Sequence, residues 1–158
     1  MSTQRLGRLE ITMTPGRLTL TGRIDDSSPL GDIAPQVPAG DIAIDTDGVT
    51  FVNSIGMREW MRLVRALRER GTVTFERVAD VLITQMNLRP EFSGSQVISF
   101  HAQYVCPSCG AEAAPLVDAV ANAQALREMT APKLPCAECG TPMDLADFPE
   151  RYLSLFRS

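Results

Sequence analysis

The sequence predicts an α/β fold with a mixed β-sheet, helices mainly on one face of that sheet, and a small second unit at the end. Residues 9–22 alternate apolar and polar side chains about a central Pro15-Gly16 turn, which indicates a β-hairpin. Residues 41–77 then show the patterns of strand, helix and strand in succession. Two similarly spaced pairs of cysteines are confined to the final third of the chain, which sets that part off as a separate unit.

The N-terminal hairpin is the first element expected. Apolar residues occupy alternate positions on both sides of the turn, namely Leu9, Ile11, Met13, Leu18 and Leu20. A short helix follows from Ser28-Pro29, because proline is favoured at the first helical position. Pro35 and Pro38 end it, since a proline inside a helix removes a backbone hydrogen bond.

A strand, a turn and a helix form the centre of the chain. The strand covers residues 41–45, and Asp47-Gly48 is expected to turn the chain. The helix runs from about residue 55 to residue 70, with Gly71 as its C-terminal stop. Its apolar residues recur at helical spacing and predict one buried stripe: Met57, Trp60, Met61, Val64 and Leu67.

The next elements continue the alternation. Residues 72–77 are predicted to form a strand, residues 79–88 a second helix, and residues 97–105 one long strand rich in bulky side chains. Pro90 follows the second helix and limits its length. Because helical connections between parallel strands are right-handed, the two main helices are expected on the same face of the sheet.

Ser54 stands where the central helix is expected to begin. A serine hydroxyl at this position commonly caps the helix by accepting a hydrogen bond from a free backbone N–H of the first turn. The same position lies at the positive end of the helix dipole, which suits a phosphate group. The residues by themselves leave both uses open, a cap and a phosphate site.

The order of these elements and two short segments resemble the STAS domain, which is the domain of anti-sigma-factor antagonists and of the cytoplasmic tails of sulfate transporters. The segments are Gly-Arg-Ile-Asp at residues 22–25 and Asp-Thr-Asp-Gly-Val-Thr-Phe-Val-Asn-Ser-Ile-Gly at residues 45–56. The resemblance covers about residues 8–104 and indicates a STAS-like domain over residues 1–104. It implies a STAS-type mixed sheet with one-sided helices.

The resemblance also implies roles for residues around the start of the central helix. In that family, a serine kinase that acts as an anti-sigma factor phosphorylates the residue that matches Ser54. The family's acidic residue at the end of the second strand matches Asp25, and Gly56 matches the glycine of the Asp-Ser-x-Gly pattern. This sequence departs from the pattern at Asn53, where a neutral amide stands in place of aspartate and removes a negative charge beside the hydroxyl.

Three arginines lie on another face of the central helix, at Arg58, Arg62 and Arg65. Charged residues opposite an apolar stripe usually form a solvated helix face. Because these arginines border Ser54, they are also candidates for docking a negatively charged protein partner.

The two cysteine pairs read Cys106-Pro-Ser-Cys109-Gly and Cys136-Ala-Glu-Cys139-Gly, and 26 residues separate them. In a reducing compartment this pattern predicts one structural zinc ion held by four thiolates, with no open coordination site. The spacing resembles a zinc ribbon of the rubredoxin type over about residues 104–143. A redox dithiol and an iron–sulfur cluster are the alternatives, although a thioredoxin-like context is missing.

Residues 105–158 are expected to form this zinc-ribbon unit, with a helix inserted between the pairs and an apolar C-terminal segment. The inserted helix ends before Pro132 and is indicated by Leu116, Ala119, Val120, Ala123, Leu126 and Met129. The apolar residues of the C-terminal segment are Phe148, Tyr152, Leu153, Leu155 and Phe156. This segment either packs on the rest of the protein or forms a surface for a partner.

Charge and hydropathy argue against a nucleic-acid-binding protein, a membrane-spanning protein and an exported protein. The net charge is −4, with −1 over residues 1–105 (11 Lys or Arg against 12 Asp or Glu) and −3 over residues 106–158 (4 against 7). Neither part has the basic balance of a nucleic-acid-binding protein. No apolar stretch approaches the roughly 20 residues of a membrane span, and the N-terminus lacks the apolar segment of a signal peptide, so a cytoplasmic location is expected.

No set of nucleophile, base and orienting acid is visible, and His101, the only histidine, is interpreted as a strand residue. The sequence therefore predicts a non-enzymatic regulatory module for protein–protein interaction, resembling an anti-sigma-factor antagonist and switched by phosphorylation of Ser54. The alternative is a phosphorylation-independent scaffold that uses the zinc ribbon and the C-terminal segment for assembly. A homo-oligomer is open in either case.

Overall fold

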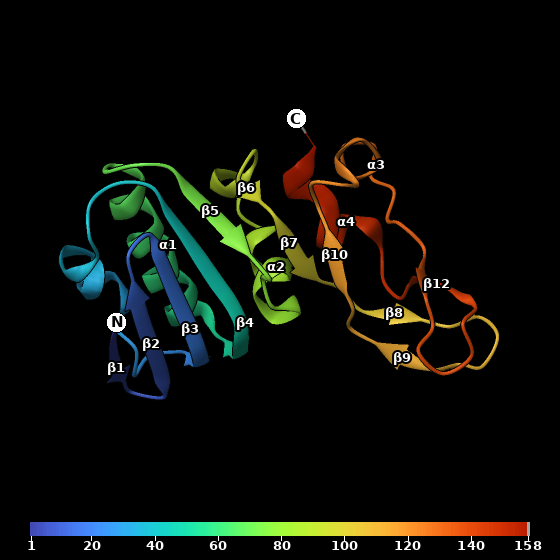
Figure 1. The fold of residues 1–158 in the computed structure, drawn as a ribbon, viewed down its shortest axis with the longest axis horizontal. Helices are drawn as coiled ribbons and strands as arrows, with labels where there is room; N and C mark the ends of the chain where they lie inside the picture. Colours follow the sequence, from blue (N-terminus) through green and yellow to red (C-terminus); the bar gives the residue numbers. More distant parts are fainter. Residues whose placement is uncertain (158) are drawn as a thin grey trace.

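The computed structural model describes residues 1–157 and shows a mixed α/β protein with three sheets (Figure 1). The largest sheet has six strands in sequential order. They are β1 (Ser2–Leu6), β2 (Leu9–Thr14), β3 (Arg17–Ile24), β4 (Ile42–Val52), β5 (Val73–Glu76) and β6 (Gln96–Val97). The first three strands pair antiparallel and the last four pair parallel, so the sheet is mixed.

The predicted hairpin is confirmed as β2 and β3, which pair from Leu9↔Gly22 to Thr14↔Arg17. The alternation of its residues has the expected effect, because Leu9, Ile11, Leu18 and Leu20 are all fully buried. Strand β1 was not predicted. It is a polar segment that adds to the outer edge of β2, and it lacks the apolar alternation that indicates a strand.

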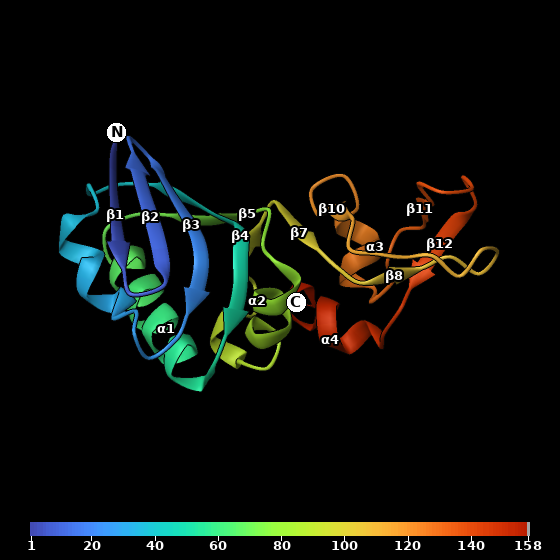
Figure 2. The ribbon, with the colours of Figure 1, turned by 90° about the horizontal axis from the view of Figure 1, so that it is seen from below.

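The helices of the first unit cover one face of the sheet (Figure 2). They are the 3₁₀ helix η1 (Leu30–Gln36), α1 (Ser54–Arg68), α2 (Asp80–Met86) and the 3₁₀ turn η2 (Pro90–Phe92). The short helix predicted after Ser28-Pro29 is present in the tighter 3₁₀ form, with Pro29 at its N-cap and not at its first helical position. The predicted stop at Pro35 is wrong, because Pro35 lies inside η1, which ends at Gln36. The one-sided arrangement follows from the parallel crossovers β3–β4, β4–β5 and β5–β6.

Helix α1 packs its apolar stripe into the core as expected. The buried residues are Met57, Trp60, Leu63, Val64 and Leu67, and Met61 is partly buried at the edge of the stripe. The ring of Trp60 lies 5.8 Å from the ring of Phe75 on β5, in a tilted arrangement. Burial of each such side chain contributes about 1.5–3 kcal/mol, so this stripe is the main attachment of α1 to the sheet.

The turn predicted at Asp47-Gly48 is wrong, because both residues lie inside β4, an 11-residue strand that runs from Ile42 to Val52. The pairing of β3 with β4 shifts register between Thr19 and Thr21 and again between Gly22 and Arg23. These irregularities accommodate extra residues of β4 without ending the strand. A side chain on Gly48 would lie 2.7 Å from Thr21 Oγ1, so glycine here serves a close strand approach and not a turn.

The single long strand predicted over residues 97–105 is also wrong. This segment divides into β6, β7 (Ser99–His101) and β8 (Tyr104–Val105), and each belongs to a different sheet. Strand β6 ends the large sheet, β7 pairs with the later strand β10 (Leu116–Asp118), and β8 belongs to the cysteine-containing unit. Residues far along the chain supply these partners, so the local pattern of bulky residues did not reveal the breaks.

The second unit contains a four-stranded sheet and three short helical segments. Its further elements are β9 (Glu112–Ala113), α3 (Ala123–Arg127), β11 (Leu134–Pro135), β12 (Pro142–Leu145), α4 (Pro149–Leu153) and η3 (Ser154–Phe156). The inserted helix is shorter than predicted, because residues 116–118 form β10. Asp118 then accepts hydrogen bonds from the amides of Val120 and Ala121, a turn that delays the helix until Ala123.

The C-terminal segment packs on the first unit. Tyr152, Leu153 and Leu155 are buried, and the ring of Phe156 lies 5.3 Å from the ring of Phe100 on β7. Asn87 accepts a hydrogen bond of 2.8 Å from the amide of Leu155. Phe148 is the exception, with 75% of its surface exposed. The buried apolar residues of both units thus form one continuous cluster.

None of the helices formed by residues 1–157 is both long and apolar enough to cross a membrane.

Candidate functional site

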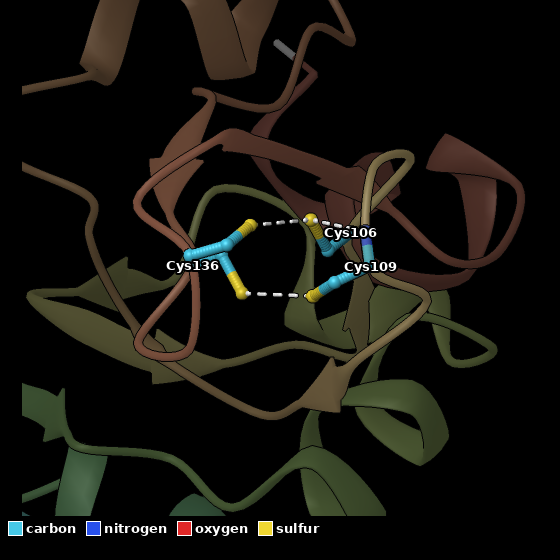
Figure 3. A group of neighbouring side chains, drawn as sticks. Cys106, Cys109 and Cys136 are labelled. Carbon is cyan, nitrogen blue, oxygen red and sulfur yellow. Dashed lines mark hydrogen bonds between the residues drawn. The ribbon is translucent and has the colours of Figure 1, made fainter.

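Four cysteines from two separate turns come together in the second unit. Cys106 and Cys109 lie on the turn between β8 and β9, and Cys136 and Cys139 lie on the turn between β11 and β12. The four sulfur atoms all lie within 4.8 Å of one another. Figure 3 shows Cys106 and Cys109 facing Cys136 across the cluster. The Sγ–Sγ distance is 3.5 Å between Cys106 and Cys139, and 3.6 Å between Cys109 and Cys136.

The two turns have the same internal construction. The amide of Gly110 donates to the carbonyl of Cys106 at 3.0 Å, and the amide of Gly140 donates to the carbonyl of Cys136 at 2.8 Å. Both glycines have left-handed backbones, with φ of 75° and 77°, which a side chain would strain. Backbone amides of Cys109 and Glu138 also point at the sulfurs of Cys106 and Cys136, both at 3.4 Å. These amides stabilise a thiolate before any cation is considered.

The sulfur positions fit a metal ion and not a disulfide. A tetrahedral ion with bonds of about 2.3 Å to sulfur places its ligands roughly 3.8 Å apart, close to the two observed distances. A disulfide has an S–S length of about 2.05 Å, and all four cysteines are free. Cys106 and Cys136 are buried, whereas Cys109 and Cys139 face solvent. This set of residues, called the four-cysteine cluster below, can therefore hold a metal ion.

Neighbouring groups shift the pKa values of two thiols of the four-cysteine cluster in opposite directions. Hydrogen bonding with the hydroxyl and the backbone of Thr141 lowers the pKa of Cys139 to about 6. For Cys109, the backbone hydrogen bond at Ala111 lowers the pKa, but the adjacent thiols of Cys106 and Cys136 outweigh it and raise the pKa to about 12. Four adjacent thiolates repel one another, so full ionisation requires a bound cation.

Ser54 is the first residue of α1 and is exposed, but it does not cap the helix. Asn53 is the N-cap, and its Oδ1 accepts a hydrogen bond of 2.8 Å from the amide of Gly56. The simple capping interpretation of Ser54 is therefore wrong, because the preceding amide side chain already performs that task. Within residues 1–157 the Ser54 hydroxyl has no hydrogen-bond partner.

Gly56 brings the first turn of α1 against the end of β3. A Cβ built on Gly56 would lie 1.9 Å from the carbonyl oxygen of Ile24, far inside van der Waals contact. The amide of Asn53 donates to the same carbonyl at 3.3 Å. The start of α1 is thus held at β3 by this hydrogen bond, and the absence of a side chain on Gly56 allows the two backbones to approach closely. Together these contacts determine the position of Ser54 on the protein surface.

Asp25 follows β3 and organises the turn below α1. It is only 3% exposed, and its carboxylate accepts hydrogen bonds from the hydroxyl of Ser27 at 2.6 Å and the amide of Ser27 at 2.9 Å. Arg23 adds an ion pair at 3.3 Å. The hydrogen bond from the Ser27 hydroxyl is the main reason that the pKa of Asp25 is lowered. Asp25 is therefore a buried positioning group, since its carboxylate is occupied by its own loop.

The three predicted docking arginines differ in their surroundings. Arg62 pairs with Glu59 at 2.7 Å and with Asp32 at 3.0 Å, and Arg65 pairs with Glu91 at 2.7 Å. Arg58 forms no ion pair in the part of the chain that the structure describes. Arg58 instead lines a hollow of about 310 Å³ together with Ser54, Met61 and Arg89. The structure thus brings Arg58 together with Ser54, whereas Arg62 and Arg65 face acidic neighbours.

Arg89 is the member of this hollow that sequence reasoning missed. It lies just before Pro90, between α2 and η2, and follows Ser54 by 35 positions along the chain. No local pattern relates it to Ser54, because only the packing of the α2–η2 loop beside α1 brings them together.

His101 is a strand residue, as interpreted from the sequence. Its Nε2 atom lies 2.6 Å from Asp47 Oδ1, and its Nδ1 atom lies 2.8 Å from the carbonyl oxygen of Ala114. These contacts connect β4 of the large sheet to the segment before β10.

On the same strand β4, Asp45 is buried against Arg17 and Arg77. Burial raises the pKa of Asp45, but hydrogen bonds from the Asp47 amide and from Arg77 outweigh this effect and lower it.

Comparison of the chain with protein-family models, with curated proteins and with solved structures found no match in any of the three.

Proposed function

We propose that this chain is a non-catalytic regulatory module for protein–protein interaction, resembling a STAS-type anti-sigma-factor antagonist, in which phosphorylation of Ser54 changes partner binding. The observation that carries the proposal is the position of Ser54. Ser54 is an exposed residue at the first position of a 15-residue helix, and its hydroxyl is not used as the cap. A kinase can therefore reach this oxygen without unfolding the helix.

A phosphate at this position would change the surface strongly. Phosphoserine adds between one and a half and two negative charges and three acceptor oxygens at neutral pH. The start of α1 is held at β3 through Gly56, so the new charge would be presented at a defined point. The partner in this proposal is a protein with serine kinase activity that binds the surface formed by Ser54, Arg58 and the first turns of α1.

The neutral side chain of Asn53 is compatible with this proposal. Its Oδ1 atom caps the helix, so it fills the structural task that aspartate performs at many helix starts. It does so without placing a negative charge beside the hydroxyl that would receive the phosphate.

We infer further that the four-cysteine cluster holds one zinc ion in a structural role. Four thiolates complete the tetrahedral coordination that zinc prefers, and no ligand position remains for a substrate. A bound zinc ion would stabilise the folded second unit, because its ligands are scattered in the unfolded chain. Reduced cysteines also fit the cytoplasm that the proposed kinase partner would share.

A phosphorylation-independent scaffold is the second candidate function, and one observation favours it. Phe148 is 75% exposed at the start of α4, and Val120 is 63% exposed near β10. Large apolar side chains left in water are a common feature of contact surfaces. Of the other apolar residues of the C-terminal segment, Tyr152, Leu153 and Leu155 are buried and Phe156 is partly buried, so this segment offers less apolar surface than the sequence predicted.

The decisive experiment measures phosphorylation and partner capture with the full chain. Wild type and Ser54→Ala are incubated with a cell extract of the source organism and ATP, and their intact masses are compared. We expect a gain of one phosphate in wild type and none in Ser54→Ala, with Ser93→Ala as a matched control at another exposed serine. Equal phosphate gain in Ser54→Ala would overturn the site assignment.

Partner capture separates the two functions. We expect wild type to retain a protein partner that Ser54→Glu releases or binds less tightly. A scaffold would retain the same partner in both forms, and Phe148→Ala would then weaken the capture.

A further inference from the structure

The hollow beside Ser54 carries positive charge without a matching acid. Its lining residues are Ser54, Arg58, Met61 and Arg89, and none of them is acidic. The hollow measures about 310 Å³. A water molecule occupies about 30 Å³ of the liquid, so a phosphoryl group fits within the hollow together with several waters.

The two arginines of the hollow differ from the other arginines along α1. Arg62 and Arg65 are each paired with carboxylates within 3.0 Å. Neither Arg58 nor Arg89 has an acidic partner among residues 1–157. The Nε atom of Arg89 is also buried and donates no hydrogen bond. A buried donor without an acceptor is rare in folded proteins, so this nitrogen is a donor that the rest of residues 1–157 does not use.

The geometry of the helix directs a group on Ser54 toward these arginines. Arg58 follows Ser54 by four positions on α1, and residues four apart lie on the same helix face. Arg89 reaches the hollow from the loop between α2 and η2. Two arginines from separate elements therefore line the same hollow as the serine that the proposed kinase would modify.

We propose that Arg58 and Arg89 form an intramolecular receptor for the phosphoryl group on Ser54. This inference rests on the proposed function, and it deepens that function by stating where the phosphate goes. The phosphate oxygens accept hydrogen bonds from both guanidinium groups, and such contacts between arginine and phosphate are among the stronger hydrogen bonds in proteins. The phosphate thereby joins the start of α1 to the α2–η2 loop.

This pair of arginines determines which surface the protein presents to a partner after phosphorylation. Two guanidinium groups largely neutralise the phosphate, so the modified surface does not present an isolated dianion. The partner instead loses Arg58 and Arg89 as free cations and meets a loop that is held to the helix. A carboxylate of the partner that pairs with Arg58 before phosphorylation is displaced afterwards.

The test places phosphoserine at position 54 during translation, so that no kinase is needed. The proton affinity of the phosphate is measured by ³¹P NMR titration of the full, metal-loaded chain. We expect the nearby guanidinium groups to reduce this proton affinity at least roughly tenfold relative to a phosphoserine peptide. The double variant Arg58→Gln/Arg89→Gln should restore the peptide value, and Arg89→Lys should restore it only in part.

Arg8→Gln serves as the matched control, because Arg8 is an exposed arginine on the turn between β1 and β2 and does not line the hollow. It should leave the titration unchanged. A phosphoserine that titrates like the free peptide in the wild-type background would overturn the receptor. The same holds if Arg8→Gln and the double variant have equal effects.

Thermal unfolding supplies a second measurement that does not depend on the titration. Phosphoserine at position 54 should raise the unfolding temperature in the wild-type background and not in the double variant. An equal change in both backgrounds would overturn the receptor. Both measurements are separate from the proposed function, because loss of kinase modification or partner capture would refute that function and leave these results standing.

Discussion

A methyl group on Gly56 would lie 1.9 Å from the carbonyl oxygen of Ile24, so the first turn of α1 touches the end of β3 at a point that admits no side chain. The contact determines where α1 begins relative to the sheet. It also explains why glycine stands two positions after Ser54. The exposed hydroxyl and its surroundings therefore depend on a backbone approach that is itself buried.

Gly56→Ala should destabilise the protein by about 3 kcal/mol, because the helix must move away from β3 and lose packing along its stripe. Urea unfolding followed by the fluorescence of Trp60, the only tryptophan, measures this change. Ile55→Ala is the matched control, since Ile55 is 49% exposed on the same turn and should change stability little. Equal stabilities for Gly56→Ala and wild type would show that the first turn is not pressed against Ile24.

Asn53→Ala should lower stability by about 1 kcal/mol, the usual effect of removing an N-cap. Asn53→Asp should retain the cap, because a carboxylate accepts the same hydrogen bond from Gly56. Ser54→Ala should leave stability within about 0.5 kcal/mol of wild type, since its hydroxyl is exposed. Chemical denaturation of the three variants tests the assignment. A larger loss in Ser54→Ala than in Asn53→Ala would contradict it.

The stabilising contribution of Asp25 should depend on pH. The Ser27 hydroxyl is the main cause of its lowered pKa, so ionised Asp25 stabilises the fold above the unfolded pKa near 3.8. This contribution disappears as the pH falls through the folded value, which lies lower still. Ser27→Ala should therefore cost about 1 kcal/mol at pH 7 and progressively less below about pH 3.8.

Urea unfolding of Ser27→Ala and wild type at a series of pH values measures this difference. Asp26→Asn is the control, because Asp26 is exposed beside the same turn. A stability difference for Ser27→Ala that stays constant across the series would refute the proposed role of the Asp25 carboxylate.

Removal of the proposed zinc ion should unfold the second unit before the first. With a chelator at neutral pH, we expect loss of one zinc ion per chain by native mass spectrometry and increased proteolysis within the cysteine-containing turns. Trp60 is fully buried in the first unit and should keep its fluorescence. Cys106→Ser should reproduce this state without chelator, whereas Ser108→Ala in the same turn should bind zinc normally. A chain purified without metal and equally resistant to proteolysis would contradict the structural role.

Several parts of the fold could be predicted because their causes are local. Alternation predicted the β2–β3 hairpin, since each apolar residue needs only its own strand to direct it into the core. The period of 3.6 residues predicted α1 in the same way, with Leu63 as an additional buried residue. The cysteine spacing predicted a cluster, because each Cys-x-x-Cys-Gly turn is built from adjacent residues.

Other parts depended on partners that are distant in sequence. Residues 96–105 form strands in three sheets because β5, β10 and β12 draw different portions of this segment to themselves. The Asp47-Gly48 pair is typical of a turn, but it is held in β4 by pairing with β3. In each case the hydrogen bonds of the final sheet outweigh the local preference of the chain.

The sequence by itself determined the hairpin, the buried stripe of α1, and a set of four cysteines able to meet. The Asn53 cap is also a local contact, made with Gly56 three residues later, whereas tertiary structure alone decided that Arg89 joins Arg58 beside Ser54. The physical reason is the range of the interactions. Alternation, helical period and tight turns act over a few residues, whereas a charged hollow is made by side chains that only the packing of separate elements brings together.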